Sequence, residues 1–367
     1  MGKTRVLIAD DSVIYRSQIK AALSLVPNVE IAGVASNGRI ACDLLQQSKV
    51  DLLILDMEMP EMDGLSTLAE MKRRGHTGTK VLLFSSTTKR GSEVTLEALR
   101  AGADDFITKP GPSEASGSQP HERIRELLEP KVHALFPEGH EAHPAPLAPV
   151  VAPSASAGAV SNFDWKSFRP GVVVIGSSTG GPTVLETIFS KIRGPLGCPI
   201  MIAQHMPPLF TATFAERLSK LSRLKVTEAK HGEPLMSDRV YIAPGDYHMT
   251  IAGRRPQAIV SLNQGPQEHF VRPAVDPLFR SAAEIYRHDT LAIILTGMGA
   301  DGRIGCEHVR SAGGPVVIQS KETCAVFGMP GAVFAANAYD AIKSPDEIIG
   351  LLSEKATVGG QAFKGAS

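Results

Sequence analysis

Short apolar runs alternate with amphipathic segments in two separate stretches of this chain of 367 residues, and this alternation limits the folds open to it. In the first stretch the apolar runs are Val6–Ala9, Val29–Val34, Leu52–Leu55, Val81–Phe84 and Phe106–Ile107. Buried strands that alternate with helices are typical of a parallel sheet covered by helices on both faces. We therefore predict an α/β domain with a doubly wound, flavodoxin-like parallel sheet over residues 1–112.

The same alternation returns from residue 169. The predicted buried strands here are Val172–Ile175, Pro199–Ala203, Val240–Ala243, Leu291–Leu295 and Val316–Ile318. Helices are predicted over Thr211–Ser219 and Gly302–Ala312, and a hairpin insertion over His248–Ile251 and Ala258–Leu262. We predict a second, Rossmann-like doubly wound parallel sheet over residues 169–356, followed by a flexible tail over 357–367.

The intervening segment, residues 113–168, has a different composition. It is rich in Pro, Ala and Ser and has little to bury, so we interpret it as a linker. One stretch, residues 121–136, has a helical pattern, which makes the linker partly helical. His140 and His143 have a metal-like spacing, but a Pro/Ala-rich linker offers no fold to hold them, so zinc is not expected.

The overall composition argues against several classes of partner and for a cytoplasmic protein. Lys+Arg and Asp+Glu are balanced at 38 each, and no basic recognition helix is evident, so nucleic-acid binding is not expected. The four cysteines lie far apart without a CxxC pattern, which indicates reduced thiols and a cytosolic location. We find neither a signal peptide nor an apolar run long enough to cross a membrane, so direct membrane insertion is not expected.

Polar residues in the first stretch stand where its predicted strands end. Asp10 and Asp11 follow the first strand, Asp56 the third, Ser85 the fourth, and Lys109 the fifth. Strand ends meet at one edge of a parallel sheet, so three carboxylates, a hydroxyl and an ammonium are expected to converge there. Such carboxylates suit Mg²⁺, and a lysine can neutralise a phosphoryl group. The pattern favours phosphoryl transfer onto a carboxylate over the alternative that each Asp only caps a helix.

This stretch resembles the receiver domain of bacterial response regulators, through LIADDS, LLILDMEMPEMDG, LLFSS and GADDFITKP. The resemblance implies that Asp56 accepts a phosphoryl group from a histidine kinase. It implies that Ser85 and Lys109 contact that group. The implied Mg²⁺ ligands are Asp10, Asp11, Asp56 and the backbone carbonyl of Glu58.

A possible nucleophile follows the first strand of the second stretch, in the motif Gly176-x-Ser178-x-Gly180. This spacing lets a sharp strand-to-helix turn present one serine, with free N–H groups of the helix behind it. The same kind of turn can also bind a phosphate or nucleotide, so the motif alone is weak. Ser177 lies beside Ser178, and we assign the nucleophile to Ser178 because it has the central position of the motif.

A base and an orienting acid are also available at strand ends. His205 ends the next apolar strand, and Asp301 follows a later one within a glycine-rich loop. Together with Ser178 they can form a Ser-His-Asp triad, although a half-buried structural histidine and a helix-capping aspartate are the alternatives. Their order in the chain, Ser-His-Asp, differs from the Ser-Asp-His order of α/β-hydrolases. The remaining histidines are predicted to be surface or loop residues, among them His231, His248, His269 and His288.

The second stretch resembles the catalytic domain of the chemotaxis protein-glutamate methylesterases. The matching motifs are IGSSTGGP, QHMPPLFTATFAERL, VYIAPGDYHM, RPAVDPLF, ILTGMGADG and FGMPGAV. The resemblance implies a catalytic triad of Ser178, His205 and Asp301, with oxyanion contacts from the backbone N–H groups of Thr179 and Met298. It implies no cofactor in the esterase site.

The two resemblances together imply a phosphorylation-activated esterase of the chemotaxis type. Its substrates would be glutamyl γ-methyl esters, and selected glutamines, on the cytoplasmic helices of chemoreceptors. We hypothesise that the unphosphorylated receiver covers the triad. Two rivals stay open: a hydrolase of general small esters, and a non-enzymatic response regulator that binds partners when phosphorylated.

Overall fold

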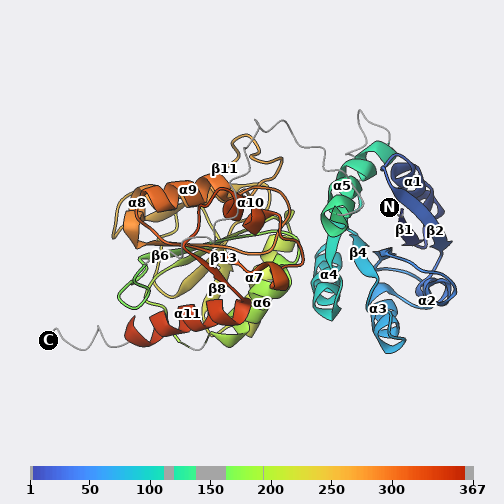
Figure 1. Ribbon diagram of the computed structural model, residues 1–367, viewed down its shortest axis with the longest axis horizontal. Coiled ribbons are helices and arrows are strands. Elements are labelled where there is room, and N and C mark those ends of the chain that lie inside the picture. Colours follow the sequence, from blue (N-terminus) through green and yellow to red (C-terminus); the bar gives the residue numbers. More distant parts are fainter. Residues whose placement is uncertain (1–2, 111–119, 138–162, 193, 360–367) are drawn as a thin grey trace. The chain divides into compact units, whose positions relative to one another are not determined.

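The structure, a computed structural model, describes residues 3–110, 120–137, 163–192 and 194–359 (Figure 1). The chain separates into two compact units, Met1–Ala152 and Pro153–Ser367. Most of the Pro/Ala/Ser-rich linker, with His140 and His143, lies outside the described residues. The division of the chain at residues 112, 168 and 356 stays a prediction.

The first unit is built on a five-stranded parallel sheet in the order β2-β1-β3-β4-β5. Its strands are β1 (Thr4–Ala9), β2 (Val29–Ala35), β3 (Leu52–Asp56), β4 (Lys80–Ser85) and β5 (Asp105–Thr108). Its first four helices are α1 (Val13–Ser24), α2 (Gly38–Gln47), α3 (Gly64–Arg73) and α4 (Lys89–Ala101). The central strand β3 is buried throughout, as a strand covered by helices on both faces must be. The predicted flavodoxin-like sheet is confirmed.

The helix predicted in the linker packs on this first unit. It is α5 (Pro120–Leu135), which lies along α1 and buries Ile124, Leu128 and Val132. Lys131 of α5 also reaches back to β5, where its Nζ lies 2.5 Å from Asp105 Oδ2. The apolar residues at every fourth position of α5 therefore pack this helix against the first unit.

The second unit contains a seven-stranded, all-parallel sheet in the order β14-β13-β12-β6-β7-β9-β8. The strands are β6 (Val172–Ser177), β7 (Ile200–Gln204), β8 (Lys225–Glu228), β9 (Arg239–Ile242), β12 (Thr290–Ile294), β13 (Val316–Gln319) and β14 (Ala341–Lys343). In this order β7 lies on one side of β6, and β12, which comes later in the chain, lies on the other side. The carboxyl end of β6 is thus the point at which the strand order reverses, the usual place for a ligand in such sheets.

Helices cover both faces of this sheet, three of them on each (Figure 1). One face carries α6 (Gly181–Lys191), α7 (Phe210–Leu221) and α11 (Pro345–Gly359), and the other α8 (Val275–Tyr286), α9 (Arg303–Ser311) and α10 (Met329–Ala335). The last helix, α11, continues into the segment predicted as a flexible tail. The predicted second parallel-sheet domain is confirmed.

The predicted hairpin is also present, as antiparallel β10 (His248–Ala252) and β11 (Ile259–Asn263). It packs against α8, and Met249 and Val260 share an apolar core with Leu278 and Phe279. The prediction that His248 is a surface or loop residue is wrong. The side chain of His248 is buried in β10, accepts a hydrogen bond from Ala274 N at Nδ1 and bonds Pro266 O through Nε2.

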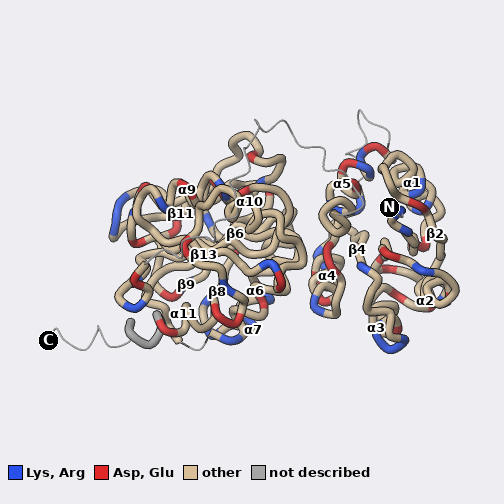
Figure 2. The backbone as a smooth tube through the Cα atoms, in the orientation of Figure 1, with Lys and Arg blue, Asp and Glu red and all other residues tan. Residues whose placement is uncertain are grey.

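Charged residues of both signs are distributed along the backbone of both units (Figure 2). Among the described residues, no helix is both long enough and apolar enough to span a bilayer.

Candidate functional site

Three neighbouring strands of the second unit, β12, β6 and β7, deliver the predicted triad residues to one edge of the sheet. Ser178 follows β6, His205 follows β7, and Asp301 stands in the loop between β12 and α9. The backbone links two of these loops, because His205 N donates to Ser177 O at 3.0 Å. The sheet order therefore brings together residues that are far apart in the sequence.

Asp301 is bound on several sides. Its Oδ2 accepts from Val275 N at 2.6 Å and lies 2.8 Å from His205 Nε2, and its Oδ1 accepts from Asp276 N at 3.0 Å. Both N–H donors belong to the first turn of α8, where helix N–H groups lack partners within the helix.

This environment decides the ionisation of Asp301. Burial alone would raise the pKa of its carboxyl, but the hydrogen bond and charge of His205 and the two N–H donors outweigh burial and lower the pKa. The group is therefore a carboxylate at neutral pH and fixes one nitrogen of the His205 ring.

The two adjacent serines have different surroundings. Ser177 is fully buried, and its hydroxyl donates to Gln204 Oε1 at 2.6 Å. The amide of Gln204 also donates to Ser178 O at 3.0 Å, so the glutamine holds the turn from behind. Ser178 is 7% exposed, and no bond like that of Ser177 ties its hydroxyl into the core among the described residues. This difference favours Ser178 as the reactive hydroxyl.

The loop that carries Met298 packs directly on the serine turn. A Cβ at Gly297 would lie 2.9 Å from Ser178 Cβ, and one at Gly328 would lie 2.7 Å from Gly297 O. Thr296 connects the serine turn to the segment before α10, since its hydroxyl donates to Thr179 O at 3.0 Å and accepts a hydrogen bond from Val326 N. Glycine is needed at 297 and 328 because only backbone fits between these segments.

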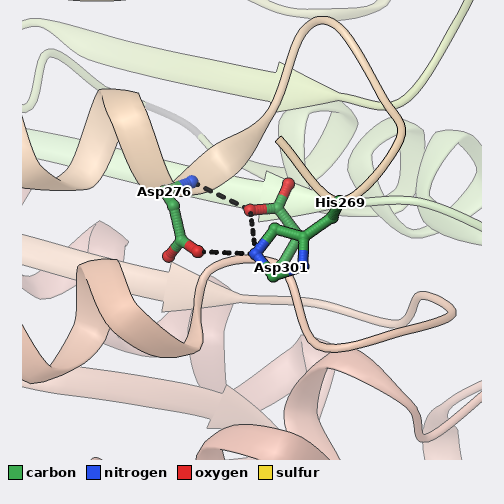
Figure 3. Close-up of side chains that lie close together, drawn as sticks. All are labelled: His269, Asp276 and Asp301. Carbon is green, nitrogen blue, oxygen red and sulfur yellow. Dashed lines mark hydrogen bonds and ion pairs between the residues drawn. The ribbon is translucent and has the colours of Figure 1, made fainter. Parts of the chain in front are cut away.

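One cluster beside the triad was not recognised in the sequence (Figure 3). Asp276 is completely buried, and its Oδ2 lies 2.8 Å from His269 Nε2, while the same nitrogen lies 3.8 Å from Asp301 Oδ1. His269 lies in a turn, as predicted, yet its ring contacts Asp276 and lies close to Asp301, the acid of the predicted triad. The only signal in the sequence was the position of Asp276 within RPAVDPLF.

The first unit gathers its own acidic cluster at the carboxyl ends of β1, β3 and β5. Lys109 Nζ lies 2.7 Å from Asp56 Oδ2 and 3.0 Å from Asp10 Oδ2. Burial raises the pKa of Asp56 to about 6, although the charge of Lys109 opposes the shift. Ser85 ends β4 fully buried, and its hydroxyl lies 2.5 Å from Thr95 Oγ1.

The arrangement of this cluster fits a divalent cation. Carboxylate oxygens of Asp10, Asp11 and Asp56 all lie within 4.8 Å of one another. Apart from the Lys109 ammonium, Oδ2 of Asp10 and of Asp56 has no hydrogen-bond partner within the described residues, although both atoms are buried. Hard oxygen donors with unsatisfied lone pairs are suited to Mg²⁺. The acidic cluster predicted from the sequence is present and typical of a receiver Mg²⁺ site.

Comparison with known proteins agrees with the two predicted domains. Residues 173–352 match the family described as CheB methylesterase, and residues 6–116 match the response regulator receiver domain. A protein-glutamate methylesterase/protein-glutamine glutaminase from Nocardioides sp. is 40% identical over 92% of this chain and 91% of its own length. The chain belongs to the CheB methylesterase family.

A second CheB relative, from Trichodesmium erythraeum, bears the same name and is 40% identical over 95% of this chain and 99% of its own length. The crystal structure of the Thermotoga maritima CheB methylesterase catalytic domain is 43% identical and covers 50% of this chain and 98% of that domain, with a TM-score of 0.48. The prediction of a receiver joined to a methylesterase domain is confirmed. The roles of individual residues stay predictions.

Proposed function

We propose that this CheB-family chain hydrolyses γ-methyl esters of glutamyl residues on the cytoplasmic helices of chemoreceptors, and deamidates selected glutamines there, with Ser178 as the nucleophile. The observation that supports this most is the pairing of His205 Nε2 with Asp301 Oδ2 at 2.8 Å, at the strand end next to Ser178. The relatives carry the names of the same two activities.

The pairing assigns a role to each nitrogen of the His205 ring. With Nε2–H held by Asp301, Nδ1 is left to accept the proton of the Ser178 hydroxyl. Ser178 Oγ then attacks the ester carbonyl, and the His205 imidazolium returns the proton to the leaving methoxide, which departs as methanol. Water, deprotonated by Nδ1, attacks the acyl-enzyme, and the glutamate carboxylate and free Ser178 are formed. Asp301 stabilises the imidazolium in both steps.

The oxyanion of each tetrahedral intermediate would be bound by the backbone N–H groups of Thr179 and Met298. Thr179 precedes α6, where the helix N-terminus favours negative charge. Met298 stands in the loop that Gly297 allows to pack against Ser178. Two N–H groups on opposite sides of the serine are the arrangement that acyl transfer needs.

In the receiver, Asp56 would accept a phosphoryl group from a histidine kinase. Mg²⁺ held by Asp10, Asp11, Asp56 and the carbonyl of Glu58 would offset the negative charge of that group. Lys109, already 2.7 Å from Asp56, would pair with a phosphoryl oxygen, and the Ser85 hydroxyl, which accepts a hydrogen bond from Thr95, would donate to another. Phosphorylation then raises the esterase activity. Free cysteines at 42, 198, 306 and 324 support a cytoplasmic location.

The test is methanol release from methylated chemoreceptor membranes, measured with and without acetyl phosphate and Mg²⁺. We expect release that increases with the phosphodonor. Absence of release in both conditions from folded protein, with turnover of aryl esters, would favour a general small-ester hydrolase instead. Absence of all hydrolysis would favour a non-enzymatic regulator.

The nucleophile is tested by a matched pair of variants. Ser178→Ala should reduce the rate by several orders of magnitude, since the acyl-enzyme can no longer form. Ser177→Ala removes only a buried hydrogen bond to Gln204, so we expect a loss of about 1–3 kcal/mol in stability and less than a tenfold loss in rate. The reverse ranking in the same methanol assay would move the nucleophile to Ser177.

A further inference from the structure

Asp301 lies between two histidines (Figure 3). His205 Nε2 lies 2.8 Å from its Oδ2, and His269 Nε2 lies 3.8 Å from its Oδ1. His269 makes its shorter contact, 2.8 Å, with Asp276 Oδ2. The triad acid is therefore the middle of a longer chain of charged groups that ends at Asp276.

Because Asp276 and Asp301 are both buried, the charge of the nearby His269 ring affects both carboxylates. Asp276 and Asp301 are 0% and 1% exposed, and the N–H of Asp276 donates to Asp301, so the two residues are in contact. Two buried carboxylates so close together repel each other unless a cation joins them or one takes up a proton. His269, whose side chain is 34% exposed, can exchange its proton with solvent and supply that cation.

The turn that carries His269 is held in an unusual backbone conformation. His269 and Phe270 have φ values of 54° and 63°, in the left-handed region that non-glycine residues rarely adopt. Glu268 on the same turn forms a two-pronged ion pair with Arg280 of α8, at 2.6 and 2.9 Å. Such a conformation persists only where its surroundings hold it, so the position of His269 over the two carboxylates is fixed by the fold.

We propose that His269 is a positioning residue of the esterase: its imidazolium neutralises the charge of Asp276 beside Asp301, so that the His205 ring faces the charge of one carboxylate, that of Asp301. This inference rests on the triad assigned above. His269 acts through Asp301 and Asp276 and requires no contact with substrate. The hydrogen bond that the ring of His269 donates to the Asp276 carboxylate raises the pKa of His269, which agrees with a cationic ring near neutral pH.

Other titratable and charged groups surround this ring on each element packed against it. They are Glu268 on its own turn, Asp276 and Arg280 on α8, Asp301 and Cys306 from the loop after β12 and from α9, and His205 after β7. Arg280 is committed to Glu268, and Cys306 is fully buried with its pKa well above the ordinary value, so it is a neutral thiol. Among the described residues, His269 is thus the group that lies within ion-pair distance of both Asp276 and Asp301 and can carry a positive charge.

The proposal fixes the direction of a pH effect. Replacing His269 by a neutral residue leaves two uncompensated carboxylates near His205, which favour its imidazolium. His205 then holds its proton up to a higher pH, where it cannot act as a base. The acid limb of the kcat/KM profile must therefore move to higher pH.

The experiment uses the full-length chain with acetyl phosphate and Mg²⁺, and follows methanol release from methylated receptor membranes over about pH 5.5 to 9. For His269→Gln we expect the acid limb to move up by about one pH unit, with kcat about tenfold lower at pH 7 and KM little changed. His288→Gln is the matched control, because it removes an exposed histidine just before β12, at the opposite edge of the sheet.

A second substitution separates charge from structure. Asp276→Asn alone should move the acid limb to lower pH, and His269→Gln combined with Asp276→Asn should return it to the wild-type position, because the net charge is then restored. A loss of rate in His269→Gln with an unmoved acid limb, or an unmoved limb in Asp276→Asn, would overturn the proposal. A wild-type chain that releases no methanol would instead show that the proposed function itself is wrong.

Discussion

The two units of this chain each bury a pair of carboxylates at the carboxyl edge of a parallel sheet, but the pKa values of Asp56 and Asp301 are shifted in opposite directions. In the receiver, Asp56 is 2% exposed and its pKa is raised to about 6, chiefly by burial. In the esterase, Asp301 is 1% exposed, and burial is outweighed so that its pKa is lowered. Two carboxyl groups that are almost equally buried thus have pKa values shifted in opposite directions.

The difference comes from the number and strength of hydrogen-bond donors. Asp301 receives two backbone N–H bonds, at 2.6 and 3.0 Å, and the His205 ring at 2.8 Å. Asp56 receives one backbone bond, from Glu58 at 3.3 Å, and the Lys109 ammonium. This difference suits the proposed roles, because a carboxylate that orients a histidine needs both oxygens held, whereas one that accepts a phosphoryl group needs an oxygen left uncommitted.

The strongest test of this comparison is the same substitution at both acids. Asp301→Asn should lower the esterase rate by about 10³- to 10⁴-fold, because an amide cannot hold the His205 tautomer that leaves Nδ1 free. Asp346→Asn, on the surface of α11, is the control. Methanol release from receptor membranes measures both, and a loss under tenfold for Asp301→Asn would remove that residue from the triad.

Asp56→Asn should act on control of the reaction. An amide cannot take up the phosphoryl group, so the ratio of rates with and without acetyl phosphate should fall to about one. Asp43→Asn, a surface change in the same unit, should keep the wild-type ratio. Persistent stimulation of Asp56→Asn would place the phosphoryl acceptor at another residue.

The smallest effect expected is on stability, and its sign differs between the two acids. Because the folded-state pKa of Asp56 lies above its unfolded value, stability is lost as pH rises from about 4 to about 6, when the buried group must ionise. Asp56→Asn avoids that cost and should stabilise the receiver by about 1–3 kcal/mol at pH 8 in EDTA, with the gain absent below about pH 4.

Asp301→Asn should do the reverse. The lowered folded-state pKa of Asp301 contributes stability above its unfolded pKa, so the esterase unit should be destabilised at pH 8. Hydrogen exchange of peptides from β3 and β12 in the full chain distinguishes the two units. Shifts of the same sign in both variants would contradict the donor-based explanation.

Much of the architecture could be predicted because the central strands are continuous apolar runs. The two edge strands of the esterase sheet, β8 and β14, could not, since each is short, partly exposed and interrupted by polar residues. The convergence of Ser178, His205 and Asp301 at one edge of the sheet could be predicted because Ser178 and His205 directly follow buried strands and Asp301 stands in the loop after another. The link from His269 to Asp301 was not, since it depends on how the turn before α8 packs on the loop before α9.

The identity of the ring nitrogen that faces Asp301 has a mechanical consequence. In the proposed mechanism the nitrogen left for Ser178 is Nδ1. Because Nε2 is held by Asp301, rotation of the ring is restricted, and the location of Nδ1 follows the backbone just beyond β7. In the proposed mechanism the distance from the base to Ser178 therefore depends on the register of β7 against β6, and even a small slip between these two strands would lengthen the path of the proton.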